Sequence, residues 1–229
     1  MPINVVAVCL QLSGRHYIFA NFLKNINRMR LIENLILCLV SAILFCSCAA
    51  RYRTINPSAI NYPEIESNSN FTYKYNVLKE AGNKKLAKKE NKYGVRIVAI
   101  KFTNTTGQTL TYGHNYKIFS GTNEAFLFDP RTANKAIRQT VPTYLLYLLL
   151  TPMRLNVGDD SKSYPIGLVI GPAITAGNVA VASTANKRFR EELINNDVKG
   201  REIKSGETFY GLIAIRDNAF MPLNLKLIK

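Results

Sequence analysis

Two long stretches without charged side chains constrain this chain more than any other feature. The first, Val141–Leu150, is almost entirely apolar, and the second, Tyr164–Ala185, is rich in glycine and alanine. A polar loop at residues 154–163 separates them. Two apolar helices joined by a polar turn form a helical hairpin, which we place at about residues 141–195.

The glycines of the second stretch indicate close packing of that helix. Gly167 and Gly171 are four residues apart, so a helix carries both on one side, where a second backbone can approach. Glycine and Pro172 weaken a helix in water, but they are tolerated in a membrane or against a close partner. Val141–Leu150 would reach only about 15 Å, half of the hydrocarbon core, so it cannot cross a bilayer alone.

Two interpretations of the hairpin stay open at this point. It either folds back on the domain as core, or it points outward and contacts a membrane or another subunit. An outward hairpin would expose more apolar surface than a soluble monomer carries. The ranges expected to make that apolar contact are Tyr144–Leu150 and Gly167–Gly177. The residues singled out within them are Tyr144, Leu145, Tyr147, Leu148, Gly167, Gly171 and Gly177.

Strand patterns lie before and after the hairpin. Residues 93–102 contain a nearly continuous β-branched run, which is typical of a central strand buried on both faces, and Thr208–Arg216 is a second strong strand. Shorter strands are expected at residues 71–77, 110–112, 115–120, 125–128 and 223–228. The spacing leaves no room for βαβ units, so we predict a mainly β domain over residues 71–229: an antiparallel immunoglobulin-like β-sandwich with the hairpin inserted.

The segment Met29–Cys48 has the three parts of a secretory signal: a basic start, an apolar run and a small residue before the cut. Its last four residues, Phe45-Cys46-Ser47-Cys48, resemble the lipobox of bacterial lipoproteins. That resemblance implies cleavage between Ser47 and Cys48, with diacylglycerol on the Cys48 sulfur. In outline the chain resembles small lipoproteins of Bacteroidota-like bacteria. A plain transmembrane anchor and a cleaved, unlipidated signal remain as alternatives.

The lipobox also divides the chain into expected parts. Residues 29–47 would be the lipoprotein signal peptide, and residues 1–28 a misassigned extension or a long basic leader. Residues 48–70 are polar and proline-containing, which predicts a lipidated tether. Ala49 and Ala50 follow the cysteine in place of an acidic residue, and by resemblance to sorting rules this implies an outer membrane lipoprotein that faces the periplasm.

Charge indicates the kind of surface that the domain meets. Without residues 1–47 the chain keeps 26 basic and 14 acidic residues, a formal charge of +12. A basic exported domain favours anionic lipid, lipopolysaccharide or wall polymer as a partner, and export argues against nucleic acid. The densest basic patch suggests four anion-contact residues, Lys84, Lys85, Lys88 and Lys89. A solvated basic face without a specific partner is the alternative.

Catalytic and metal chemistry find little support in the composition. All four cysteines lie at or before Cys48, and His114 is the one histidine after it. Thiol nucleophiles, cysteine metal sites and two-histidine zinc motifs are therefore excluded from the folded part by count. We expect no cofactor and no catalytic residue, and a non-catalytic binding or structural role. The alternative is a cell-wall or envelope hydrolase that uses carboxylates.

Overall fold

The computed structural model describes residues 48–62, 70–157 and 162–228. The chain divides into a unit that ends at Cys48 and a compact unit from Ala49 to Lys229, and the fold below is that of the second unit. The predicted signal peptide, the cleavage at Ser47 and the start codon lie outside the described residues.

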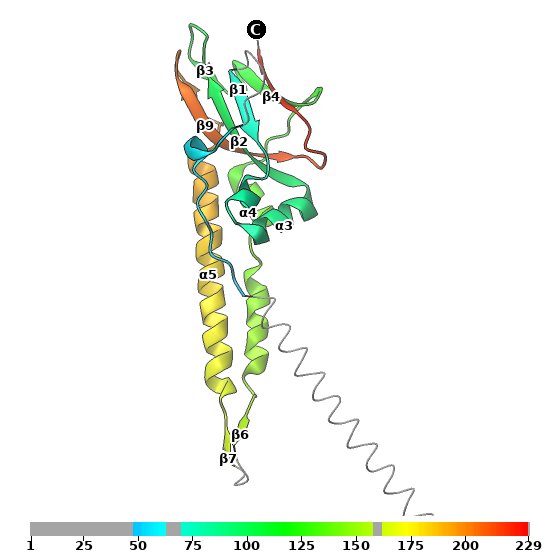
Figure 1. Ribbon diagram of the computed structural model, residues 1–229, viewed down its shortest axis with the longest axis vertical. Helices are drawn as coiled ribbons and strands as arrows, with labels where there is room; N and C mark the ends of the chain where they lie inside the picture. The colour runs from blue at the N-terminus through cyan, green and yellow to red at the C-terminus, as the bar shows by residue number, and fades with distance from the viewer. Residues whose placement is uncertain (1–47, 63–69, 158–161, 229) are drawn as a thin grey trace, which may run out of the picture. The chain divides into compact units, whose positions relative to one another are not determined.

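Two small antiparallel sheets form one end of this unit (Figure 1). The first has the order β1-β2-β9, with β1 at Phe71–Lys74, β2 at Val95–Thr103 and β9 at Thr208–Arg216. The second has the order β10-β4-β5, with β10 at Leu223–Leu227, β4 at Tyr116–Ser120 and β5 at Asn123–Glu124. A short pair joins β3 (Leu110–Thr111) to β8 (Glu202–Ile203).

Strands β2 and β9 lie at the centre of the packing. They pair over their full length, from Val95 opposite Arg216 to Thr103 opposite Thr208. One face of the pair, including Ile100 and Ile213, packs with the second sheet, and the other face packs with helices. The prediction of a central strand buried on both faces is confirmed, and this double burial explains why its sequence is apolar without alternation.

The helices cover the outer face of the first sheet. They are η1, a 3-10 turn at Pro57–Ala59, α2 at Val77–Glu80, α3 at Lys84–Tyr93 and α4 at Pro130–Ile137. Helix α4 begins where Asp129 accepts the backbone N–H groups of Arg131 and Thr132, with Pro130 at its first position. Two buried side chains, Leu86 and Glu90, anchor the basic helix α3 to the domain.

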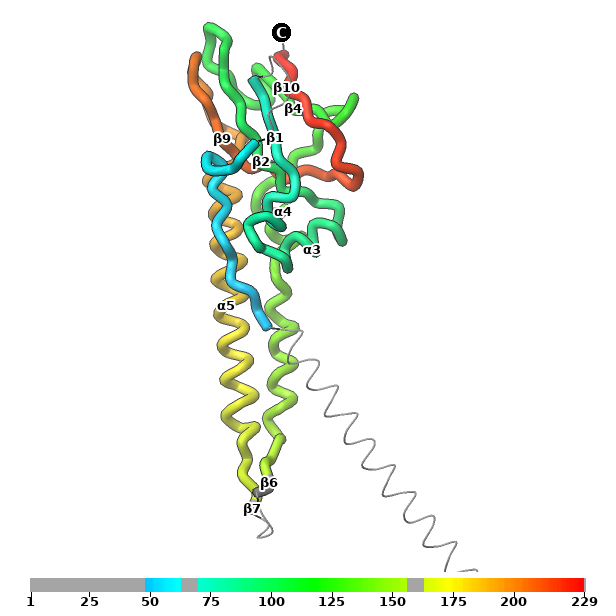
Figure 2. The backbone as a smooth tube through the Cα atoms, in the orientation of Figure 1, coloured from blue at the N-terminus to red at the C-terminus, as the bar shows by residue number. Residues whose placement is uncertain are grey.

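The helical hairpin extends away from the sheets (Figures 1 and 2). Its first arm is η2, Val141–Leu150, and its second arm is α5, Gly167–Asn195. A two-stranded ribbon, β6 (Leu155–Val157) with β7 (Lys162–Tyr164), closes the far end. The first arm is a 3-10 helix, and its buried residues Tyr144, Tyr147 and Leu150 recur every three positions, which is the period of that helix.

Each of the two interpretations of the hairpin holds for a different part of α5. The C-terminal half is core, because Ala182, Ala185, Phe189 and Leu193 are at most 4% exposed. The N-terminal half packs mainly on η2, and Leu168, Val169 and Ile170 are exposed, so the distal hairpin points outward.

The first part of the predicted tether, residues 49–62, is packed against the domain in the structure. Residues 49–62 run beside α5 in an ordered, partly buried path, in blue in Figure 2. Tyr52 and Ile55 are buried in the core, and the ring of Tyr52 lies 5.4 Å from that of Phe189. Side chains of distant residues satisfy the backbone of this segment, so its polar composition does not make it a free linker.

The fold prediction is correct only in outline. The sheets are antiparallel as expected, but helix, at 38% of the described residues, exceeds strand, at 26%, so the mainly β description is not confirmed. The expected strand at residues 125–128 is a single bridge between Leu127 and Ile215. A helical layer covers one of the two facing sheets, and the immunoglobulin-like topology stays a prediction.

Candidate functional site

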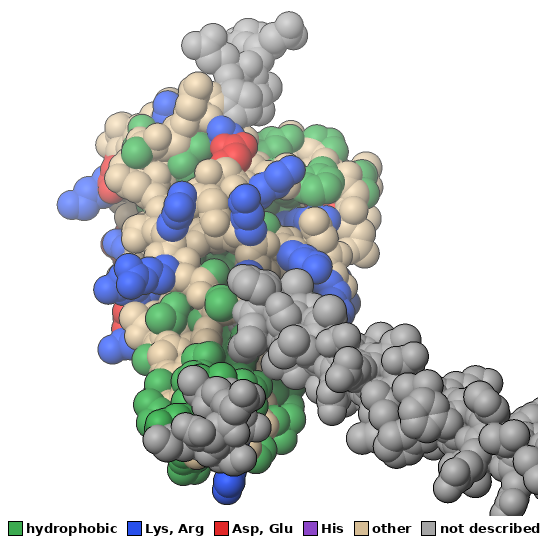
Figure 3. Space-filling view, turned by 60° about the horizontal axis from the view of Figure 1, so that its bottom comes forward, with side chains coloured by type: hydrophobic (Ala, Val, Ile, Leu, Met, Phe, Trp, Pro, Cys, Tyr) green, Lys and Arg blue, Asp and Glu red, His purple; other side chains and the backbone are tan. Residues whose placement is uncertain are grey.

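The distal hairpin carries the largest exposed aliphatic surface in the described part of the chain. On η2, Leu146 is 57% exposed and Leu149 is 75% exposed, and on α5, Leu168 is 60% and Val169 is 72% exposed. Leu145, Leu148, Ile170, Met153 and Leu155 add to the same surface. In Figure 3, apolar side chains gather at this end of the molecule, with one basic side chain at its tip.

Some of the predicted contact residues belong to this surface and others do not. Leu145, Leu148 and Gly177 are exposed. Four are buried, which corrects the prediction, and these are Tyr144, Tyr147, Gly167 and Gly171.

The two buried glycines explain how closely the arms pack. A Cβ atom added at Gly167 would lie 2.5 Å from the carbonyl oxygen of Thr151 and closer still to that of Leu150. A Cβ atom at Gly171 would lie 3.2 Å from the carbonyl oxygen of Tyr147. The expected close approach of a second backbone is thus present, and the backbone is that of the other arm.

The ranges expected to make apolar contact, Tyr144–Leu150 and Gly167–Gly177, contain most of the outward aliphatic residues, but the residues singled out within them did not include these. Leu146, Leu149, Leu168, Val169 and Ile170 lie within the two uncharged stretches, but the α-helical period assumed for the first arm could not assign its faces. With three residues per turn, Leu145 and Leu148 form one exposed ridge, and Leu146 and Leu149 form another. A 3-10 period applied to Val141–Leu150 would have found both.

A group of basic side chains lies where the hairpin leaves the sheets. On α3, Lys89 donates a hydrogen bond from Nζ to Oγ1 of Thr140 at 2.9 Å and another to the carbonyl oxygen of Arg138. Burial lowers the pKa of Lys89, and the neighbouring charges of Lys92 and Arg138 lower it further. Lys85 lies over the ring of Tyr144, with Nζ 5.8 Å from its centroid. Helix α3 is therefore attached to the base of the first arm.

Further basic residues belong to this group. Arg51, Lys187 and Arg188 are exposed and come from the N-terminal segment and α5. Together with Lys84, Lys85, Lys88, Lys89 and Arg138 they form what we call the basic collar. In Figure 3, basic side chains gather above the apolar end of the molecule. From Gln139 to Asn186, the charged residues of the sequence are confined to positions 154–162, at the far end of the hairpin.

The N-terminal segment is fixed at the border between the collar and the aliphatic surface. The backbone N–H of Ala49 donates to Oδ1 of Asn178 at 2.6 Å. Ala50 forms two hydrogen bonds with the side chain of Gln139, at 3.0 and 2.6 Å. Cys48, the predicted lipid site, is exposed and is one residue from this border.

The carboxylates of Glu90 and Glu192 are buried and accept hydrogen bonds from backbone N–H groups. Glu90 accepts the N–H of Ile97 at 2.7 Å, and burial raises the pKa of Glu90 to about 7. Glu192 accepts the N–H of Ile55 at 2.6 Å, and burial raises its pKa as well. Within the described ranges no group of three metal-ligating side chains occurs.

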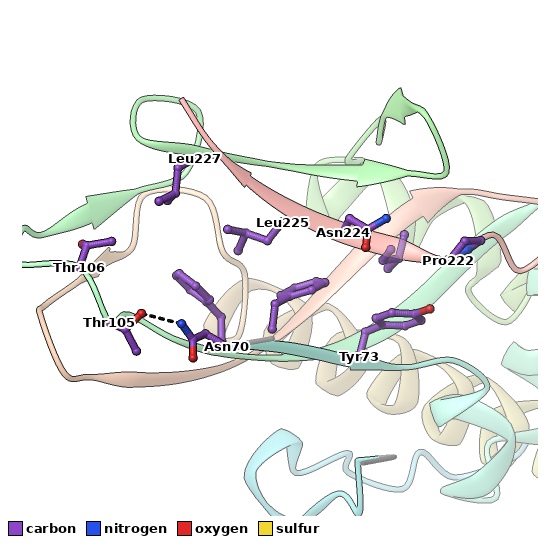
Figure 4. Close-up of a pocket in the computed structure, with 11 residues that line it drawn as sticks. Asn70, Tyr73, Thr105, Thr106, Pro222, Asn224, Leu225 and Leu227 are labelled. Carbon is purple, nitrogen blue, oxygen red and sulfur yellow. Dashed lines mark hydrogen bonds between the residues drawn. The ribbon is translucent and has the colours of Figure 1, made fainter. Parts of the chain in front are cut away.

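A groove of about 490 Å³ lies between β1 and β10, at the end of the unit away from the hairpin (Figure 4). It is lined by aromatic, aliphatic and amide side chains, among them Phe71, Phe102 and Leu225. None of its described lining residues is acidic, so this groove offers no carboxylate pair for a hydrolase.

Comparisons with known proteins give no relative: no family model, curated protein or solved structure matches this chain.

Proposed function

We propose that this protein is a lipoprotein of the bacterial envelope with a non-catalytic role, and that its distal hairpin inserts into the membrane that holds the lipid of Cys48. Residues 29–47 act as the signal peptide, and the protein resides in the outer membrane and faces the periplasm. Helix α5 is long and apolar enough to cross a membrane: its apolar 18-residue window has a mean hydropathy of 1.5, and 22% of that window is buried in the protein. These values are compatible with membrane association.

The exposed aliphatic surface carries the proposal. Leu145, Leu146, Leu148, Leu149, Leu168, Val169 and Ile170 are each between 39% and 75% exposed. Together, their exposed fractions add up to about four fully exposed side chains. Transfer of that much apolar surface to hydrocarbon would release about 6–12 kcal/mol. Exposed apolar patches of this kind mark surfaces that contact a membrane or another protein.

Electrostatics favours the same orientation. The basic collar lies near the base of the hairpin, where anionic head groups would lie if the hairpin entered the bilayer end-on. One of its members, Lys187, also pairs with Glu191 at 3.9 Å. Each lysine or arginine near an anionic surface contributes about 1 kcal/mol of attraction. The lysines predicted to touch anions, Lys84, Lys85, Lys88 and Lys89, lie on α3 within this collar.

Vesicle flotation tests the proposal on an unlipidated chain that begins at residue 48. Both hydrophobic clusters lie between Tyr52 and Leu223, so this chain keeps its core. We expect it to float with zwitterionic vesicles. Leu146→Asp should reduce the partition about 100- to 1,000-fold, because an aspartate in hydrocarbon costs about 3–4 kcal/mol relative to leucine.

Leu227→Asp is the matched control, since Leu227 is 55% exposed and Leu146 is 57% exposed. Leu227 lies on β10, away from the hairpin, and its substitution should leave flotation unchanged. Equal flotation of the two variants, or no flotation of the parent chain, would contradict the proposal.

A further inference from the structure

A pocket of about 350 Å³ lies between the N-terminal segment and α5. Figure 2 shows this segment, in blue, running beside the helix. The buried side chains of Tyr52 and Ala185 give the pocket an apolar floor, and none of its described lining residues is acidic. Its lining consists of two residues of the segment and five of α5, which are Arg51, Tyr52, Ala180, Val181, Thr184, Ala185 and Arg188.

The two arginines of this pocket have no acidic partner. Neither Arg51 nor Arg188 forms an ion pair with another residue of the described ranges. The next carboxylates along α5 are engaged elsewhere. Glu191 lies 3.9 Å from Nζ of Lys187, and Glu192 accepts a backbone N–H at 2.6 Å. Like charges in one pocket repel each other, and an anion bound between them relieves that repulsion.

Phosphate is the anion that suits this pair. A guanidinium group is planar and binds phosphate oxygens with two parallel hydrogen bonds. The hydroxyl of Thr184, in the same lining, is a further donor.

The backbone around Arg51 is held in place before any ligand binds. Ala50 forms two hydrogen bonds with the side chain of Gln139, at 3.0 and 2.6 Å. Arg53 forms two with the side chain of Asn83, at 2.8 and 2.7 Å. Because the chain is fixed on both sides of Arg51, binding does not have to order it, which lowers the entropic cost of binding.

An apolar face of α5 continues from the pocket toward the distal hairpin. Its members follow one another at helical spacing, so they lie on one side of the helix, and they are Val181, Gly177, Ile174 and Ile170. A Cβ atom added at Gly177 would meet nothing within 4 Å, and Ile170 is 39% exposed. An acyl chain attached to a phosphate in the pocket could cover this face, whereas a free phosphate ion would leave it bare.

We propose that this pocket binds the phosphate group of one anionic phospholipid. Arg51 and Arg188 bind the phosphate oxygens, Thr184 donates to them, and an acyl chain lies along the face from Val181 to Ile170. This inference rests on the proposed function, because it names a lipid held beside the hairpin. It adds one specific site to the diffuse attraction of the basic collar.

A soluble short-chain lipid tests the site without a membrane. The unlipidated chain that begins at residue 48 is isotope-labelled and titrated, in separate NMR experiments, with monomeric dihexanoylphosphatidylglycerol and with inorganic phosphate. We expect saturable shifts of the amide signals of Thr184 and Ala185. The lipid should bind at least about tenfold more tightly than inorganic phosphate, because its methylene groups are removed from water.

A double variant that keeps the net charge separates this site from diffuse attraction. Lysine cannot make the paired hydrogen bonds of a guanidinium group, so Arg51→Lys with Arg188→Lys should bind the lipid about tenfold more weakly. Arg131→Lys with Arg190→Lys is the matched control. Both of these arginines are exposed and neither lines the pocket, so the control should bind like the parent chain.

The outcomes distinguish this inference from the proposed function. Absence of saturable lipid binding, or equal affinity of the two double variants, would overturn the site. Equal affinity for the lipid and for inorganic phosphate would overturn the lipid as its ligand. None of these results affects flotation with zwitterionic vesicles, which tests the exposed leucines of the hairpin. Loss of flotation with lipid binding retained would contradict the proposed function alone.

Discussion

Helix α5 should have two energetically different halves, and paired substitutions can measure the difference. Phe189 is fully buried in the C-terminal half and packs with the ring of Tyr52 at 5.4 Å between centroids. Val169, in the N-terminal half, is 72% exposed. We compare Phe189→Ala with Val169→Ala in the unlipidated chain that begins at residue 48.

The expected magnitudes follow from this burial. Removing a buried phenylalanine side chain costs about 3–5 kcal/mol, because the transfer energy is lost and a cavity remains. Val169→Ala should change the free energy of unfolding by no more than about 0.5 kcal/mol, since it empties no packed space. In urea, the midpoint should fall by roughly 1.5–3 M for the first variant and stay in place for the second.

Circular dichroism during urea unfolding, without membranes or detergent, is the assay. A loss of more than about 2 kcal/mol in Val169→Ala would refute the division of α5, because it would mean that the distal half packs on the domain in water. Equal midpoints for Phe189→Ala and the parent chain would refute the assignment of the proximal half to the core.

Four further predictions follow from the same geometry. Gly167→Ala should destabilise the hairpin by about 1–3 kcal/mol through contact with two carbonyl oxygens, whereas Gly177→Ala, whose Cβ would meet nothing within 4 Å, should be neutral or stabilising by urea unfolding. The pKa of Glu90 is about 7 in the folded chain and 4.5 in the unfolded chain, so the free energy of unfolding should fall by up to about 3 kcal/mol as pH rises from 4.5 to 7. Glu90→Gln should remove that share of the pH dependence. An unchanged pH profile in this variant would contradict the assignment. Replacing both Lys84 and Lys88 by Gln should weaken binding to anionic vesicles about 30-fold at low salt, and replacing both Lys204 and Lys226, on the sheets, should not. Cys48→Ala should abolish incorporation of radiolabelled palmitate, and equal labelling of the variant would contradict the lipid assignment.

The sequence predicted those elements whose burial is evident from their own composition. The β-branched runs of β2 and β9 are buried on both faces, so their composition alone predicted them. The hairpin followed from the absence of charge in its two arms. The face that each arm exposes did not follow, because the 3-10 period of η2 differs from the α-helical period.

Polar contacts between residues far apart in the chain could not be predicted from the sequence. The N-terminal segment looked like a tether, but Asn178, Gln139 and Glu192 satisfy its backbone from positions more than 80 residues away. The basic patch suggested a hairpin loop or a short turn of helix, and it is the helix α3, whose two anchoring side chains, Leu86 and Glu90, are a small part of its sequence. Helix α4 was missed although Asp129-Pro130 is a helix-start signal.

The depth of a spin label at Leu149 in vesicles tests the membrane contact of the hairpin most directly. Leu149 is 75% exposed, so Leu149→Cys accepts a label without disturbing the fold. Oxygen collects in hydrocarbon and a polar nickel chelate stays in water. Insertion predicts that adding vesicles raises the collision rate of the label with oxygen and lowers that with the chelate. A label that stays fully accessible to the chelate while the protein is bound to vesicles would contradict it.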